Sequence, residues 1–277
     1  MTKKLVIGLA FGTYNSFIPI FISSIFLAYP EEKTNIFVKI ISDNIHNKKL
    51  NKALDVIRNN ITSNFELIDY NEETNLKEMM YVVEYGRYYR YLLDYENVKG
   101  YDYAFITDID SIFINKGDEL FYNYIEHMKK TNISFSNQIR RSSFNTEKPR
   151  LNCNHHFIDV EKYFSKYNDI NKYYRLNTDK IKEFQMIDEQ FLYYIMDKEE
   201  ISILRKNNDL SSKEIGIHLG IYRRKRDFNF IESDIKKFTL NKIKQVINNK
   251  SFIKINKINY NRPYSLFIKE LNKFLHP

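Results

Sequence analysis

The chain of 277 residues has no tryptophan, only seven glycines and a single cysteine. That cysteine, Cys153, excludes an internal disulfide framework and any cysteine-rich zinc site, and it fits a reducing compartment. Long hydrophobic runs are also lacking, because the longest, residues 17–29, is too short to span a bilayer. The apolar run at residues 5–11 has no small-residue cleavage site nearby and predicts a strand, not a signal peptide. We therefore expect a cytoplasmic protein without a transmembrane helix.

Basic charge is concentrated in the C-terminal part of the chain. The net charge is +8, and residues 223–277 hold 14 Lys and Arg but only 4 Asp and Glu. Such a segment suits solvent, an anionic membrane leaflet or an acidic acceptor. We expect residues 1–230 to form the main domain and residues 231–277 to form a basic, helical extension packed on or near it. The inner membrane face is the partner that we expect for this extension, so the protein would be peripheral there.

Strands and helices alternate along most of the chain, which predicts an α/β fold with a mostly parallel central sheet. Apolar runs predict the strands, at residues 4–11, 35–41, 65–69, 101–107, 156–160 and 216–219. Helical spacing predicts the helices, at residues 20–28, 48–59, 77–95 and 187–196. A strand at residues 111–114 is expected to continue the one at 101–107 after a break. The polar residues 137–150 are expected to form a mobile loop over a site.

The sequence Asp108-Ile109-Asp110 carries the strongest chemical signal. It follows directly on the apolar strand at residues 101–106, and ligands of open α/β sheets bind at the carboxyl ends of strands. Residues i and i+2 of an extended segment point the same way, so both carboxylates can meet one divalent ion. Mg²⁺ and Mn²⁺ take oxygen ligands and bridge carboxylates to substrate phosphates. The alternative is a strand-end turn, where Asp is common.

The residues around this motif resemble those of the GT-A glycosyltransferases, particularly family 8. Residues 88–93 (YYRYLL) and 101–110 (YDYAFITDID) are similar to the family's Tyr-Tyr-Arg helix and the Asp-x-Asp strand that follows it. Further segments resemble later family elements in the same order: Asn-Ala/Ser-Gly, an Asp-Gln-Asp helix start and a late His-x-x-Gly, here at residues 152–159, 188–192 and 218–220. Residues 12–25 resemble the first loop and helix, which hold the nucleotide.

This resemblance implies a GT-A fold, which is a Rossmann-like fold of nucleotide-diphospho-sugar transferases. It also implies a metal-dependent hexosyltransferase that uses Mn²⁺ or Mg²⁺. The donor would be a nucleotide sugar, with UDP the expected nucleotide. The acceptor would be an oligosaccharide or a lipid-linked glycan of a bacterial surface, such as lipopolysaccharide or capsule. The resemblance and the lack of an evident base motif both favour retention of anomeric configuration. We expect no nucleic-acid partner, and the sequence leaves the oligomeric state open.

The resemblance also implies roles for single residues. Asp108, Asp110 and His218 would hold the metal ion. Asp188 and Glu189 would be catalytic and would face the transferred sugar, and Glu189 stands where the family often has Gln, which suggests a nucleophilic carboxylate like that proposed for the related family 6. The donor-binding residues would be Ala10, Tyr14, Arg90, Asp108, Asn154 and Lys225. Arg suits phosphate recognition through its planar fork.

The sequence departs from the family at three places. Gly12 and Thr13 stand where an acidic residue usually reads the uracil edge, which weakens the inference of uridine. Residues 222–226 (YRRKR) replace a Lys-Pro-Trp segment and could bind a diphosphate by charge. Asn154 stands where the family has a glycine, which predicts a glycine-like backbone position, and Asn adopts such a position better than most residues.

Other interpretations stay open at this point. Arg90 could be a helix-surface ion-pair partner of Glu84 or Asp94, and His218 a structural histidine. Asp188 and Glu189 could be charges that favour a helix N-terminus. The alternative activities are a sugar-1-phosphate nucleotidyltransferase, for which residues 8–14 lack the expected Arg, a basic nucleic-acid-binding protein, and an inactive GT-A scaffold.

Overall fold

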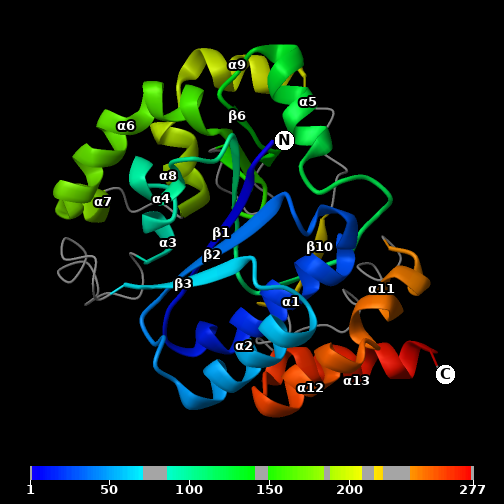
Figure 1. The fold of residues 1–277 in the computed structure, drawn as a ribbon. Helices are drawn as coiled ribbons and strands as arrows, with labels where there is room; N and C mark the ends of the chain where they lie inside the picture. The colour runs from blue at the N-terminus through cyan, green and yellow to red at the C-terminus, as the bar shows by residue number, and fades with distance from the viewer. Residues whose placement is uncertain are drawn as a thin grey trace.

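A six-stranded sheet forms the centre of the molecule (Figure 1). The computed structural model describes residues 2–70, 86–140, 149–183, 188–207, 215–220 and 238–275. The strand order is β3-β2-β1-β4-β9-β6. Their bounds are β1 (Lys4–Ala10), β2 (Ile36–Ser42), β3 (Phe65–Asp69), β4 (Tyr103–Ile106), β6 (Phe135–Ser136) and β9 (His156–Asp159). Strands β3, β2, β1 and β4 are parallel, whereas β9 runs antiparallel to both β4 and β6. The predicted α/β class with a mostly parallel sheet is confirmed.

The sheet separates two hydrophobic cores, because successive side chains of a strand point to opposite faces. On β1, Val6 belongs to one core, while Leu5 and Ile7 belong to the other. On β4, Phe105 belongs to the same core as Val6, while Ala104 belongs to the same core as Leu5 and Ile7. Both strands are buried on their two faces, which explains why their sequences are continuous apolar runs.

The first core is covered by helices from both ends of the chain. The short helix η1 (Gly12–Phe17) leads into α1 (Ile18–Ala28), which has Pro19 in its first turn and is buried along almost its whole length. Helix α2 (Lys48–Asn60) begins at Asn47, whose side chain accepts from the backbone of Lys49 and Leu50. The C-terminal helices are α11 (Leu240–Ile247), α12 (Lys250–Ile258) and α13 (Arg262–Leu275). Helix α12 packs against α1 and α2, and α11 packs against α1. Phe267 of α13 is buried in the same core, and the orange and red ribbons show the three helices near α1 and α2 (Figure 1).

The second core is covered by helices from the middle of the chain. These are α3 (Gly86–Tyr89), α4 (Tyr95–Val98), α6 (Val160–Leu176), α7 (Thr178–Glu183), α8 (Asp188–Ile195) and α9 (Lys198–Lys206). Helix α5 (Tyr122–Thr131) contacts β6 and β9. Two short ladders complete the fold: β5 (Ser111–Phe113) with β10 (Gly216–His218), and β7 (Ile139–Arg140) with β8 (Arg150–Leu151). No helix among the described residues is long and apolar enough to cross a membrane.

Two predictions of local structure were wrong. The helix predicted over residues 77–95 ends at Tyr89 where it is described, and α4 begins only at Tyr95 because Asp94 caps it. The strand at Ser111 does not continue β4, because β5 leaves the central sheet and pairs with β10. The predicted loop at 137–150 carries β7 and the start of β8 at its ends, and residues 141–148 lie outside the described part.

Candidate active site

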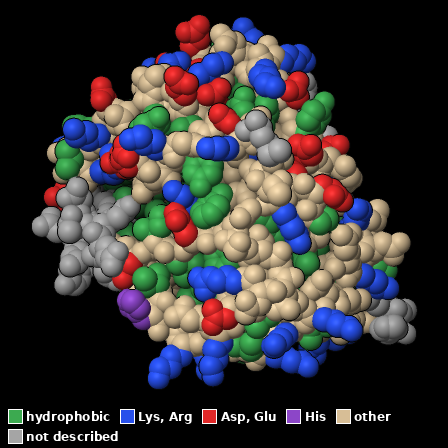
Figure 2. All heavy atoms as spheres, viewed as in Figure 1, with side chains coloured by type: hydrophobic (Ala, Val, Ile, Leu, Met, Phe, Trp, Pro, Cys, Tyr) green, Lys and Arg blue, Asp and Glu red, His purple; other side chains and the backbone are tan. Residues whose placement is uncertain are grey.

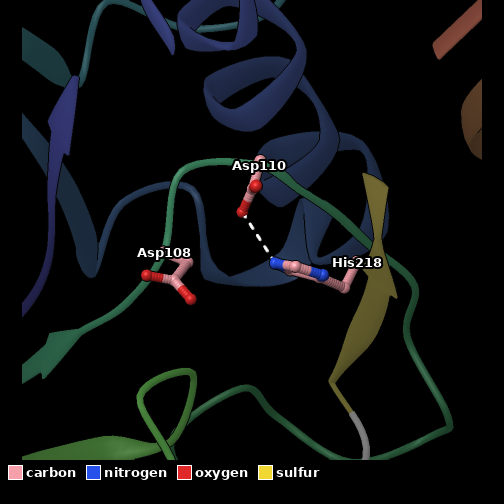
Figure 3. Close-up of side chains that lie close together, drawn as sticks. All are labelled: Asp108, Asp110 and His218. Carbon is pink, nitrogen blue, oxygen red and sulfur yellow. Dashed lines mark ion pairs between the residues drawn. The ribbon is translucent and has the colours of Figure 1, made fainter. Parts of the chain in front are cut away.

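Two strand ends bring three candidate metal ligands together. Asp108 follows β4 at the carboxyl edge of the parallel strands, and Asp110 directly precedes β5. In the β5–β10 ladder, Ser111 is opposite His218, so the register places His218 beside Asp110. The Leu219 amide donates to the Asp110 carbonyl at 2.7 Å and fixes the end of the ladder. Figure 3 shows both carboxylates and the imidazole turned toward one shared space.

The geometry of these three side chains suits a divalent cation. Asp108, Asp110 and His218 each offer a ligand atom, and these atoms all lie within 4.8 Å of one another. Opposite ligands of a small octahedral cation are about 4.2 Å apart, so the three groups need only a small adjustment to meet one ion. His218 Nε2 lies 2.9 Å from Asp110 Oδ1. The Asp110 side chain is only 4 % exposed, whereas that of His218 is 35 % exposed, so the site opens to solvent on the histidine side.

Gly220 keeps the space beside the three ligands free. A Cβ atom at this position would lie 2.5 Å from Asp110 Oδ2 and 2.6 Å from His218 Cε1, closer than real Cβ contacts. A side chain at this position would therefore have to displace the Asp110 carboxylate or the His218 ring. The predicted metal-ligand set of Asp108, Asp110 and His218 is brought together as one cluster, with two hard oxygen ligands and one imidazole.

Arg90 joins this cluster to the start of α8. Its guanidinium makes ion pairs with Asp108 through Nη1 and with Asp188 through Nη2. Arg90 is 6 % exposed, and its guanidinium lies 4.8 Å from the centre of the Tyr91 ring. The alternative of a helix-surface pair with Asp94 was wrong, because Asp94 pairs with Arg175 at 2.6 Å. Glu84 lies outside the described residues.

Cys153 and Arg150 connect Glu189 to the same cluster. The Cys153 thiol donates to Asp108 Oδ2 at 3.1 Å, and its backbone amide donates to Glu189 Oε1 at 3.3 Å. The other oxygen of Glu189 pairs with Arg150 Nη1 at 3.0 Å. Burial raises the pKa of the Cys153 thiol, and Glu189 and Asp188 add to this rise against the opposing effect of Arg90. The thiol is therefore protonated at neutral pH and acts as a hydrogen-bond donor.

The fold is similar to that of several glycosyltransferases of known structure. An active-site variant of LgtC aligns with a TM-score of 0.50 at 17 % identity, over 68 % of each chain. GlyE, a glycosyltransferase from Streptococcus pneumoniae, also aligns with a TM-score of 0.50, at 11 % identity, over 99 % of this chain and 64 % of its own. The chain has the GT-A fold. The galactosyltransferase LgtC with donor and acceptor sugar analogues has a TM-score of 0.49 at 15 % identity, over 69 % of each chain. No protein-family model and no curated protein matches the sequence.

The first loop of this GT-A domain is held by a carboxylate from the neighbouring strand. Asp43 follows β2 and accepts from the Gly12 amide at 2.9 Å and from Asn15 Nδ2 at 2.6 Å. Gly12 has a φ of +57°, which favours glycine. A carboxylate from the end of β2 therefore lies against the first loop and holds it in place.

The other predicted donor-binding residues lie at different places in the GT-A domain. Ala10 is buried at the carboxyl end of β1, and the Tyr14 ring lies 6.0 Å from that of Phe17. Asn154 has no positive φ, since Asn132 is the only non-glycine residue of the described ranges that has one. The expectation of a glycine-like backbone position at Asn154 was therefore wrong. Lys225 lies outside the described residues.

Sequence reasoning missed four residues of this region: Asp43, Arg150, Cys153 and Gly220. Asp43 follows a predicted strand at the same sheet edge as Asp108, so the rule that singled out Asp108 could have found it. Cys153 lies in the segment 152–159 that resembles the family, but no role at the site was inferred for its thiol. Gly220 lies in the segment that resembles His-x-x-Gly, but its contact with Asp110 needs the tertiary fold. Arg150 carries no local signal, because its contact with Glu189 likewise exists only in the folded chain.

Proposed function

We propose that this protein is a metal-assisted glycosyltransferase that moves a sugar from a nucleotide diphosphate to a carbohydrate acceptor. The observation that carries the proposal is the cluster of Asp108, Asp110 and His218 at the carboxyl edge of a GT-A sheet. UDP is the expected nucleotide, and a lipid-linked or surface oligosaccharide, such as lipopolysaccharide or capsule, is the expected acceptor. The reaction is expected to retain anomeric configuration.

The residues of the site divide the work of binding and reaction between them. Asp108, Asp110 and His218 would hold Mn²⁺ or Mg²⁺, and the ion would neutralise charge on the departing nucleoside diphosphate. Arg90 contributes a fixed positive charge at the junction of Asp108 and Asp188, where a phosphate or a sugar hydroxyl can be bound. Asp188 lies in the first turn of α8 and would orient the transferred sugar.

Glu189 is the candidate for the carboxylate that faces the anomeric carbon. It is buried in the first turn of α8, where Arg150 and the Cys153 amide hold both of its oxygens in place. A carboxylate so fixed can attack an anomeric carbon or stabilise a positively charged transition state. Replacing Glu189 by Gln keeps the shape and removes the charge, so turnover should fall by at least a hundredfold. Unchanged turnover would remove the nucleophile from the proposal.

The experiment that tests the proposed function measures release of nucleoside diphosphate from a panel of nucleotide sugars. With Mn²⁺ and a sugar acceptor, one donor should give turnover that stops when Asp110 is changed to Asn. Lys172→Gln, on the exposed surface of α6, is the matched control and should keep full activity. Release from none of the sugars, with Mn²⁺ bound, would speak against glycosyl transfer.

An anionic membrane is the second partner that we propose. Helices α2 and α12 pack together, and exposed lysines lie on both of them: Lys48, Lys49, Lys52, Lys250, Lys254 and Lys257. Two exposed apolar side chains lie among them, Ile253 at 40 % and Tyr260 at 68 % exposure. Figure 2 shows blue side chains along the lower edge of the molecule, where Figure 1 places these helices. Each lysine near an anionic surface contributes about 1 kcal/mol.

Vesicle sedimentation tests this membrane surface. The triple change Lys250→Glu, Lys254→Glu and Lys257→Glu should abolish binding to vesicles that contain phosphatidylglycerol, because it reverses charge on one helix face. The matched control changes Lys162 and Lys172 to Glu on exposed positions of α6 and should leave binding intact. Equal loss in both variants, or no loss in the first, would contradict the proposed surface.

A further inference from the structure

Arg90 and the candidate metal site share one carboxylate. Asp108 belongs to the cluster with Asp110 and His218, and it is also an ion-pair partner of Arg90. Its second oxygen accepts from the Cys153 thiol. Both oxygens of Asp108 therefore have partners within the protein before any cation is present.

The other ligands of the cluster also have partners of their own. Asp110 Oδ1 lies 2.9 Å from His218 Nε2, so these two candidate ligands also interact with each other. Asp188, on the far side of Arg90, shares the same guanidinium. An arginine keeps its proton in proteins, so the positive charge of Arg90 stays beside the cluster at every physiological pH.

A divalent cation that enters this cluster alone meets two obstacles. It competes with Arg90 for Asp108, and it is repelled by the guanidinium charge, which burial shields from water. A nucleoside diphosphate removes both obstacles. Its phosphate oxygens can accept hydrogen bonds from the guanidinium in place of Asp108, and other phosphate oxygens can complete the coordination of the ion. Cation and nucleotide therefore favour each other, and thermodynamic linkage makes this coupling reciprocal.

We propose that Arg90 is the resident counter-charge of Asp108 and couples the binding of the divalent cation to the binding of the nucleoside diphosphate. This inference rests on the proposed function, because it takes the cluster as the metal site and the diphosphate as its ligand. Its consequence is a site that holds the cation weakly when it is empty of nucleotide and tightly when the donor is present.

Isothermal titration of the full chain with Mn²⁺, with and without saturating UDP or GDP, tests the coupling. The wild type should bind Mn²⁺ at least tenfold more tightly with the better nucleotide than without it. Arg90→Gln removes the charge and should bind Mn²⁺ alone at least tenfold more tightly than the wild type, with most of the coupling lost. Arg90→Lys keeps a charge and should retain weak binding of Mn²⁺ alone.

Arg175→Gln is the matched control, because Arg175 is a half-buried arginine of α6 that pairs at 2.6 Å with Asp94, a residue outside the cluster. It should leave the coupling at its wild-type value. Equal Mn²⁺ affinity of the wild type and Arg90→Gln without nucleotide would overturn the inference and leave the proposed function standing. If Arg90→Gln does not fold, equal Mn²⁺ affinity of the wild type with and without nucleotide overturns it as well. Failure of the wild type to bind Mn²⁺ under any condition would overturn the proposed function and the inference together.

Discussion

At the scale of single residues, Gly220 lies directly against two of the candidate metal ligands. A methyl group there would collide with the Asp110 carboxylate and the His218 ring. We predict that Gly220→Ala weakens Mn²⁺ binding at least tenfold, measured by titration in the presence of nucleotide, while the circular dichroism spectrum stays unchanged. Gly8→Ala is the control, since its new Cβ would meet its nearest atom at 3.4 Å, which is ordinary contact. Equal Mn²⁺ affinity of Gly220→Ala and the wild type would contradict this role.

His156 makes the stability of the fold depend on pH. It is fully buried on β9, its Nδ1 lies 3.3 Å from Asn137 Nδ2, and burial lowers the pKa of His156 to about 3, with a further lowering by Arg90. The unfolded chain binds a proton at this residue below pH 6.5, and the folded chain does not. The contribution to stability is therefore complete above pH 6.5 and is lost as the pH falls toward 3.

Urea unfolding at several pH values measures this effect. Between pH 6.5 and pH 5, His156 should reduce the free energy of unfolding by about 2 kcal/mol. His156→Phe should remove that part of the pH dependence, because phenylalanine has no group that titrates. The fold should tolerate the change, because Asn137 Nδ2 still donates to the Asn152 carbonyl. An unchanged pH slope in His156→Phe would show that other groups cause the acid sensitivity.

Residues in a recognisable motif could be predicted from the sequence, and residues whose contacts arise only in the folded chain could not. Asp108, Asp110 and His218 were predicted because carboxylates at a strand end and a late histidine have a recognisable pattern, and the structure places them within 4.8 Å. The partners of Arg90 could not be predicted, because Asp188 is brought to it by the packing of α8 against α3. The roles of Arg150 and Gly220 likewise exist only in the folded chain.

At the scale of helices and strands, the C-terminal helices are part of the fold. Phe252 and Ile255 of α12 are fully buried in the core that also contains α1 and α2. Phe252→Ala should reduce the free energy of unfolding by about 3–5 kcal/mol, because it leaves a cavity in a close-packed core. Urea unfolding checks this value, and Ile253→Ala on the exposed side of the same helix is the control. A loss below about 1 kcal/mol would mean that α12 packs only loosely on the domain.

Periodicity predicted the first three strands and the helices between them almost to the residue. It failed where tertiary contacts override local pattern. The Asp94 cap divides a segment that has helical spacing, and the pairing of β5 with β10 takes an apolar strand out of the main sheet. Apolar and basic residues are interspersed in the C-terminal part of the chain, and the described residues there form amphipathic helices. Ile243 of α11 and Phe267 of α13 lie on the buried sides of these helices.

At the scale of the whole molecule, the GT-A sheet separates two cores and gathers the candidate site at one edge. The parallel strands β1 and β4 and the ladder of β5 and β10 all end there, so residues far apart in the sequence meet. The fold class followed from the alternation of elements. The antiparallel pairing of β9 with β4 and β6 could not be predicted in this way, because the direction of a short apolar strand is not encoded in its own sequence.

The central claim is that Asp108, Asp110 and His218 hold one divalent cation that binds a nucleoside diphosphate. A crystal structure of the protein with Mn²⁺ and UDP or GDP, with anomalous data that locate manganese, tests this claim most directly. The account predicts one anomalous peak, coordinated by both aspartates, by His218 Nε2 and by diphosphate oxygens. Bound nucleotide without manganese at these three side chains, or manganese only at other positions, would contradict it.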